Sequence, residues 1–208
     1  MKKRIVAGKR IEGILGVCLL FVFLTGCSDK VVLQEGTNLL LDKEGGVTVT
    51  YIEDFPSDYY DISELEIMNQ EEVEAYNQQA GSTVVEVVST TTDGSKLMLT
   101  MKYRDMDDYA DMNQKSVYSG TVEEALALGY DLNSIFIPAK NKAGTKDEEQ
   151  MNRMDWESLG THHIVITNEP STVHTYKKIE YTTENVEVSE DRKMATIAGE
   201  EQAVIVFK

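Results

Sequence analysis

Two β-rich segments separated by an Asp-Gly dipeptide place the strongest constraint on how this chain folds. Residues 83–92 and 96–104 are rich in valine, threonine, leucine and methionine, and they flank Asp93-Gly94. Asp-Gly is favoured in tight turns between antiparallel strands, because glycine adopts a positive φ at little cost. The sequence therefore predicts an antiparallel β-hairpin over residues 83–104.

Further β-branched segments lie before and after this hairpin. Residues 47–52 are one candidate strand. After a polar loop at 139–150, the C-terminal part of the chain has five more, at residues 162–167, 172–181, 185–188, 194–198 and 203–207. The short connections between the last five strands predict a C-terminal β-meander, in which strands pair in chain order. The last segment, Ala-Val-Ile-Val-Phe, is apolar throughout, so we expect it to be buried and its deletion to abolish folding.

Helix signals occur between the β-rich segments. Ser63-x-x-Glu66 has the form of a capping box, with Ile62 and Ile67 placed as a hydrophobic staple, and Gly81 would end a helix. We expect a helix near residues 70–80, with residue 64 as an alternative start. A strand over residues 62–67 is the competing interpretation.

Two shorter helices complete the expected elements. Residues 105–114 suggest a short acidic helix, and the capping box at Thr121–Glu124, followed by Gly129, predicts a helix of two turns. The predicted fold is α+β: one antiparallel, β-rich domain over residues 46–208 with a few short helices and the C-terminal meander. Residues 27–45 read as a polar tether in which Leu39–Leu41 could form an edge strand.

The N-terminus has a different composition. Five of the first ten residues are Lys or Arg, and an apolar run of 11 residues follows from Ile14 to Leu24. A membrane-spanning helix needs about 20 apolar residues, so this run is short for one. A basic segment followed by a short apolar segment is typical of a secretory signal peptide.

The apolar run ends in Leu24-Thr25-Gly26-Cys27. This sequence resembles the lipobox of bacterial lipoproteins, with the small Gly26 before the cysteine and an aliphatic residue three positions before it. The resemblance implies that Cys27 carries a diacylglyceryl thioether and that residues 1–26 are removed as a lipoprotein signal peptide. It covers residues 1–27 only and implies no activity. An uncleaved anchor, or an ordinary signal peptide with a chance cysteine, is the alternative.

Lipidation would leave the mature chain without a free thiol, because Cys18 lies in the signal peptide. A cysteine metal site, a cysteine nucleophile and a disulfide are then excluded. The net charge of −16 becomes −20 once residues 1–26 are removed. Such an acidic chain lacks the basic footprint of nucleic-acid binding, and it is attracted to cations or basic partners.

Candidate metal and catalytic residues fail the known templates. His162 and His163 are neighbours and would point to opposite faces of a strand, while His174 would lie opposite Val165 or Ile166 on the next strand. The acidic stretch 105–111 lacks the glycine and glutamate that a calcium-binding EF-hand loop needs. We therefore assign no metal, no cofactor and no catalytic residue.

Sulfur and aromatic residues are better explained as packing groups. Met98 and Met101, and Met151 and Met154, form two pairs with a spacing of three, which thioethers could use to bind copper. Core filling is the simpler role. Trp156 could anchor a ligand but is more simply a core residue, and the ten tyrosines suit both strands and binding faces.

These observations predict an exported protein, lipid-anchored through Cys27 at the extracytoplasmic face of the cell membrane. Its mature domain is expected to be a non-catalytic module that binds a protein or polymer partner at the cell surface. Two alternatives remain open: an extracytoplasmic hydrolase that uses carboxylates, and an accessory subunit of a membrane transporter.

Overall fold

The computed structural model describes residues 31–55, 61–132, 136–139 and 156–208, with the side chain of residue 157 left out. Residues 33–208 form one compact unit, and the following account concerns this unit. The predicted signal peptide, the lipidation site Cys27 and the Met151–Met154 pair lie outside the described residues, as does most of the polar loop at 139–150.

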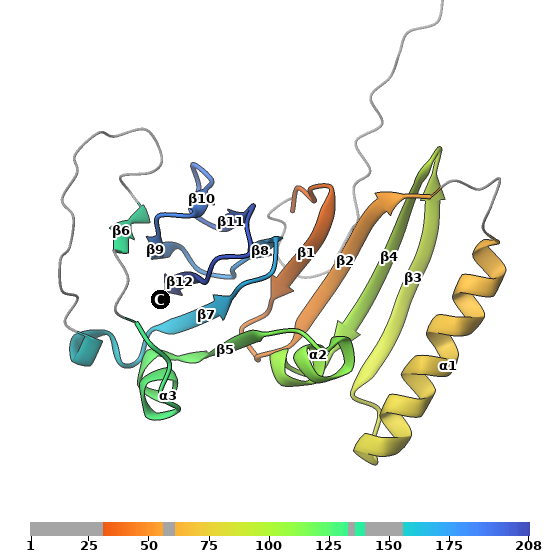
Figure 1. Cartoon of the computed structure of the whole chain (residues 1–208), viewed down its shortest axis with the longest axis horizontal. Helices are drawn as coiled ribbons and strands as arrows, with labels where there is room; N and C mark the ends of the chain where they lie inside the picture. Colours follow the sequence, from red (N-terminus) through yellow and green to blue (C-terminus); the bar gives the residue numbers. More distant parts are fainter. Residues whose placement is uncertain (1–30, 56–60, 133–135, 140–155) are drawn as a thin grey trace, which may run out of the picture. The chain divides into compact units, whose positions relative to one another are not determined.

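Twelve strands form two sheets in the described part of the chain (Figure 1). The seven-stranded sheet, called the large sheet below, has the order β10 (Val186–Val188), β11 (Met194–Ile197), β8 (Ser171–His174), β1 (Gly36–Leu41), β2 (Val47–Asp54), β4 (Lys96–Tyr103) and β3 (Val85–Asp93). The five-stranded small sheet has the order β5 (Val117–Thr121), β7 (His163–Thr167), β12 (Ala203–Phe207), β9 (Ile179–Thr183) and β6 (Phe136–Pro138). All pairs are antiparallel except β1 with β8.

Three α-helices accompany the sheets: α1 (Ile62–Ala80), α2 (Met106–Asn113) and α3 (Val122–Ala127), with a 3-10 turn at Trp156–Leu159. The α+β class and the mostly antiparallel arrangement are therefore confirmed. Asp105 caps α2, and Thr121 with Glu124 forms the predicted capping box of α3. In the described residues, no helix is both long enough and apolar enough to cross a bilayer.

The predicted hairpin is confirmed as β3 and β4. Asp93 and Lys96 form the closing pair, and Gly94 has a φ of 62° at the first position of the turn. The register shifts between Val87 and Ser89, so Val88 is an extra residue that bulges from β3. Because β4 also pairs with β2, β3 is the strand at one edge of the large sheet.

One hydrophobic cluster joins the two sheets. Leu39, Val49 and Met101 pair across neighbouring strands of the large sheet, and each is at most 5% exposed. Val165 and Ile205 of the small sheet belong to the same cluster. The other face of the small sheet packs against α3 through a second cluster that includes Val122, Ala125, Ile164, Ile166, Val204 and Val206. The small sheet is therefore buried on both faces.

The C-terminal strands do not form the predicted meander. The predicted strand 172–181 divides into β8 in the large sheet and β9 in the small sheet, and β7 pairs with β5 and β12 instead of β8. All four residues of β8 and all five of β12 are buried. A strand that is buried on both faces has no regular alternation of polar and apolar residues. The sequence therefore contained no sign that β8 and β12 belong to different sheets. The predicted burial of β12 is confirmed.

Residues 36–41 lie inside the range that the sequence analysis gave to the tether. They form β1, a central strand between β2 and β8, so the expectation of an edge strand was wrong. The side chain of Asn38 is fully buried and bonds both backbone groups of Gln34, at 2.8 and 2.7 Å. These bonds hold the segment before β1 against the large sheet.

The face of the large sheet opposite the core carries a polar row. Residue-by-residue pairing aligns Ser89, Thr100, Thr50, Asn38, Thr172, Thr196 and Glu187 across all seven strands. Each of these residues alternates with a core-facing neighbour. The Thr50 and Thr100 hydroxyls bond each other at 3.1 Å, which explains how polar groups are satisfied in the middle of the sheet.

Candidate binding groove

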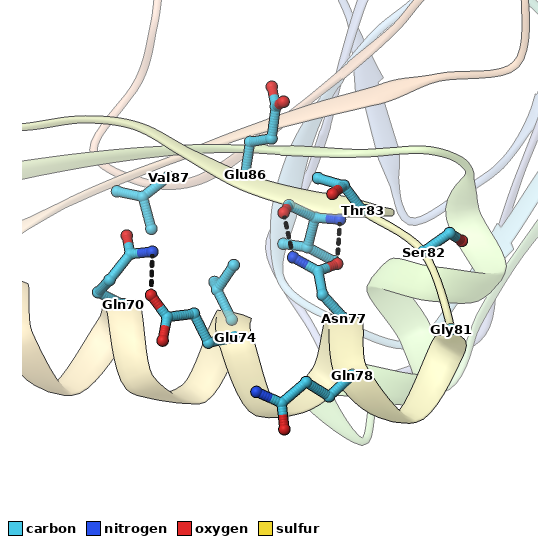
Figure 2. Close-up of a pocket in the computed structure, with 11 residues that line it drawn as sticks. Gln70, Glu74, Asn77, Gln78, Gly81, Ser82, Thr83, Glu86 and Val87 are labelled. Carbon is cyan, nitrogen blue, oxygen red and sulfur yellow. Dashed lines mark hydrogen bonds between the residues drawn. The ribbon is translucent and has the colours of Figure 1, made fainter.

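A groove of about 830 Å³ runs between α1 and the edge strand β3 (Figure 2). Its lining consists of Gln70, Val73, Glu74, Asn77 and Gln78 from α1, Gly81, Ser82 and Thr83 after the helix, and Val85, Glu86 and Val87 from β3. Polar groups of the helix thus face the start of an edge strand. We call this the α1–β3 groove.

The limits of α1 follow from its caps. The Asp61 side chain accepts a hydrogen bond from the Ser63 backbone N–H at 2.8 Å, so Asp61 is the N-cap and not the predicted Ser63. The helix therefore begins at Ile62, before both the expected start near residue 70 and the alternative start at 64. Gly81 ends the helix as predicted, with a φ of 73°. The strand alternative for residues 62–67 was wrong, and so was the staple, because the side chain of Ile67 is 59% exposed.

The C-terminal half of α1 carries the side-chain contacts that join the helix to the rest of the fold in the described residues. Val73 is the one buried residue of the helix, and it packs into the cluster that joins the two sheets. One turn later, the Tyr76 hydroxyl donates a hydrogen bond to Asp108 Oδ1 of α2 at 3.3 Å. The next residue, Asn77, bonds β3 directly.

The side-chain amide of Asn77 pairs with the edge strand as a peptide group would. Its Nδ2 donates to the carbonyl oxygen of Val85 at 2.9 Å, and its Oδ1 accepts from the N–H of Val85 at 3.0 Å. The N–H of Val84 donates to the same Oδ1 at 2.8 Å. Figure 2 shows Asn77 reaching from the helix to the strand, while Glu86 points away from the helix. Asn77 therefore closes the beginning of the β3 edge.

Beyond Val85 the edge of β3 is open in the described structure, where no strand pairs with it on this side. In an antiparallel pair, the N–H and C=O groups of one residue point toward the partner strand, and those of the next residue point away from it. Asp93 closes the hairpin with Lys96, so Thr91 faces β4, whereas Thr90 and Thr92 face outward. The same alternation, shifted by the bulge, makes Val85 outward, as its bonds to Asn77 require.

The helix beside this edge is strongly acidic. It contains five glutamates and neither lysine nor arginine. Within the groove, Glu74 accepts a hydrogen bond from Gln70 at 3.0 Å, which holds its carboxylate at the wall. Two exposed apolar residues lie on the same two elements, Ile67 of α1 at 59% and Val88 of β3, next to the groove residue Val87, at 55% exposure. Ile67 lies on the same stripe of the helix as Gln70 and Glu74, at spacings of three and four.

A second, smaller pocket of about 630 Å³ lies beside α2 and contains Tyr76, Arg104 and Asp108. Asp108 is 5% exposed, and the Arg104 Nη2 donates to its Oδ1 at 3.0 Å. Burial raises the pKa of the Asp108 carboxyl, and the negative charge of Asp105 raises it further, against the opposing effect of Arg104. Asp105 itself accepts from the Asp108 N–H at 2.9 Å. Two of the carboxylates in the acidic stretch 105–111 thus have structural roles, because Asp105 caps α2 and Asp108 bonds Arg104 and Tyr76.

The three histidines do not converge. His162 Nε2 lies 3.1 Å from Glu180 Oε2, and the ring of His163 stacks on Phe207 with centroids 5.3 Å apart. His174 lies in the other sheet, beside Leu40 and Met194, so its expected position opposite Val165 or Ile166 was wrong. Burial lowers the pKa of His174 to about 4. In the described part of the chain, no three potential metal ligands come together.

The methionine and tryptophan residues act in packing where they are described. Met101 is in the core, whereas Met98 pairs with Ile52 on the opposite face of the sheet, so the two thioethers do not meet. Trp156 packs edge to face on Phe136, with centroids 4.9 Å apart, and joins the second core cluster.

Comparisons with known proteins give no relative from which a function could be transferred: no family model, no curated protein and no solved structure matches the chain. The sequence analysis did not identify the α1–β3 groove, because nothing in the sequence distinguishes Asn77 from an ordinary exposed asparagine on a helix. A signal for the groove was present in the charge of residues 62–80, where none of the glutamates has a basic residue three or four positions away.

Proposed function

We propose that this chain is an exported protein, anchored by a lipid on Cys27 at the extracytoplasmic face of the membrane, and that it binds a partner without catalysing a reaction. The lipobox resemblance of Leu24–Cys27 and the short apolar run before it support the anchoring. The α1–β3 groove supports the binding role, and we assign the partner to this site.

The observation that carries the binding role is an open sheet edge that lies beside a strongly acidic helix. Soluble proteins usually cover, shorten or charge the edges of their sheets. Here Asn77 closes one position at Val85, and in the described residues no strand pairs with the edge beyond it. A partner that binds here gains apolar contact and backbone hydrogen bonds together.

Site-specific photo-crosslinking in intact cells tests the binding role. A photoreactive amino acid is introduced at Ile67 or Val88, and as a matched control at Leu128, which is 67% exposed at the end of α3. We expect a discrete crosslinked product from positions 67 and 88 and none from position 128. Products that are equal at all three positions, or absent at 67 and 88, would contradict the assignment.

The anchoring is tested separately by a Cys27→Ser variant. Without the thiol no thioether can form, so we expect the unlipidated, unprocessed precursor to accumulate, and metabolic labelling with a fatty acid to fail. A variant that is processed and labelled like the wild-type chain would show that Cys27 is not the lipidation site.

A further inference from the structure

We propose that the outward edge of β3 binds an extended, positively charged polypeptide segment, which adds to the large sheet as a further strand. This inference rests on the proposed function and concerns the part of the β3 edge that continues beyond the α1–β3 groove, whose lining on β3 ends at Val87. The bound segment would be short, because the open part of the edge extends only from the bulge at Val88 to the turn at Asp93.

The backbone geometry supports strand addition. Thr90 and Thr92 point two N–H and two C=O groups away from β4. Only Thr91 lies between them, and the strand is regular there. These four groups form the pattern that an added strand pairs with. Their side chains point to a sheet face, so neither threonine blocks access to its own backbone groups.

The pairing of Asn77 with Val85 provides a precedent within the molecule. A primary amide presents the same donor and acceptor as a peptide group, and both are used at 2.9 and 3.0 Å. The edge of β3 thus already accepts a peptide-like partner at its first outward position. A bound strand would continue this pairing at the next regular outward positions, beyond the bulge.

Charge decides between a second copy of the chain and a basic partner. Pairing two β3 edges would bring together two α1 helices, each with five glutamates and no basic residue. The whole chain carries a net charge of −16, so self-association is opposed at long range as well. A lysine- or arginine-rich segment instead places positive side chains beside the glutamates of α1. Such charges also raise the association rate.

Alternate side chains of an added strand point to the same face of the sheet. Those on the α1 side would lie over the stripe that contains Ile67, Gln70 and Glu74. This stripe presents one apolar and two polar groups, so it suits a segment in which aliphatic and basic residues both occur. Selectivity would come from this stripe, and affinity from the backbone bonds.

The test uses the purified full chain in a neutral detergent and a fluorescent nine-residue peptide that alternates lysine with valine or threonine. We expect saturable binding by fluorescence anisotropy that weakens with salt, and at least tenfold weaker binding of an otherwise identical peptide N-methylated at alternate residues. N-methylation removes the donors of one edge and leaves the charge unchanged. Equal binding of the two peptides would overturn strand addition.

Thr90→Pro provides the matching change in the protein. The N–H of Thr90 points outward, so proline there removes no bond between β3 and β4 and is compatible with an edge strand. We expect at least tenfold weaker peptide binding, whereas the control Thr90→Val, which keeps the N–H, should bind like the wild type. If circular dichroism shows that Thr90→Pro is unfolded, the comparison of the N-methylated and unmethylated peptides on the wild-type chain decides whether strand addition occurs.

The outcomes separate the two proposals. Crosslinks at Ile67 and Val88 in cells, together with no difference between the peptides, would retain the groove as a binding site and reject strand addition. Tight binding of a peptide with glutamate in place of lysine would reject the basic partner. Absence of crosslinks at both positions would reject the groove itself.

Discussion

The side chain of Asn77 should contribute measurably to the free energy of unfolding. Asn77→Ala removes three hydrogen bonds to the backbone of Val84 and Val85, with lengths of 2.8, 3.0 and 2.9 Å. A protein hydrogen bond contributes about 0.5–1.5 kcal/mol net, so three would give roughly 3 kcal/mol. Asn77 is half-buried, and water can replace part of the lost bonding. We therefore expect a loss of about 1–2 kcal/mol.

Urea denaturation of the purified full chain measures this loss as a lower midpoint with an unchanged slope. Gln78→Ala is the matched control, because Gln78 is an exposed neighbour on the same helix, and its replacement should change the free energy of unfolding by less than about 0.5 kcal/mol. Hydrogen exchange should locate the effect at the amides of Val84 and Val85. Equal stabilities for the Asn77→Ala and Gln78→Ala variants, or unchanged exchange at those amides, would refute the view that Asn77 closes the edge.

Three further predictions concern stability. Burial lowers the pKa of His174 from 6.5 to about 4, so between these pH values the unfolded state binds more protons than the folded state. Acidification from pH 6.5 to pH 4 should therefore lower the free energy of unfolding by up to roughly 3 kcal/mol, and a His174→Leu variant should not show this loss in parallel urea titrations. Tyr76→Phe removes the bond to Asp108 and should lower the free energy of unfolding by about 1 kcal/mol, measured the same way against the wild type. Deletion of residues 203–208 removes the fully buried central strand of the small sheet, and a cooperative thermal transition in the truncated chain would show that this strand is dispensable.

The sequence predicted elements whose signals are local. The hairpin at Asp93-Gly94, the capping box of Thr121 and the end of α1 at Gly81 all depend on a few neighbouring residues, and each is present in the structure. The turn and cap preferences of these residues act whatever the tertiary fold. Local signals therefore fixed where many elements begin and end.

The sequence could not predict how the strands divide between two sheets. β7 and β8 are separated by only three residues, a spacing that suits a hairpin, yet they belong to different sheets. The outcome depends on how the large sheet and α3 together cover the two faces of β12, and this is a property of the whole core. For the same reason β1 appeared to be part of a tether, although the polar Asn38 is buried in its centre.

The acidity of α1 gives a physical reason why an open sheet edge need not cause aggregation. An exposed edge pairs readily with any other edge, and proteins commonly prevent this with charge or bulges. Here the bulge at Val88 interrupts the strand and Asn77 closes its beginning, while the glutamates of α1 repel identical copies. In the proposed complex the same glutamates would attract a partner of opposite charge, so a single feature would oppose self-association and select the partner. Neutralising them should therefore weaken binding of the lysine peptide and promote self-association in the same variant.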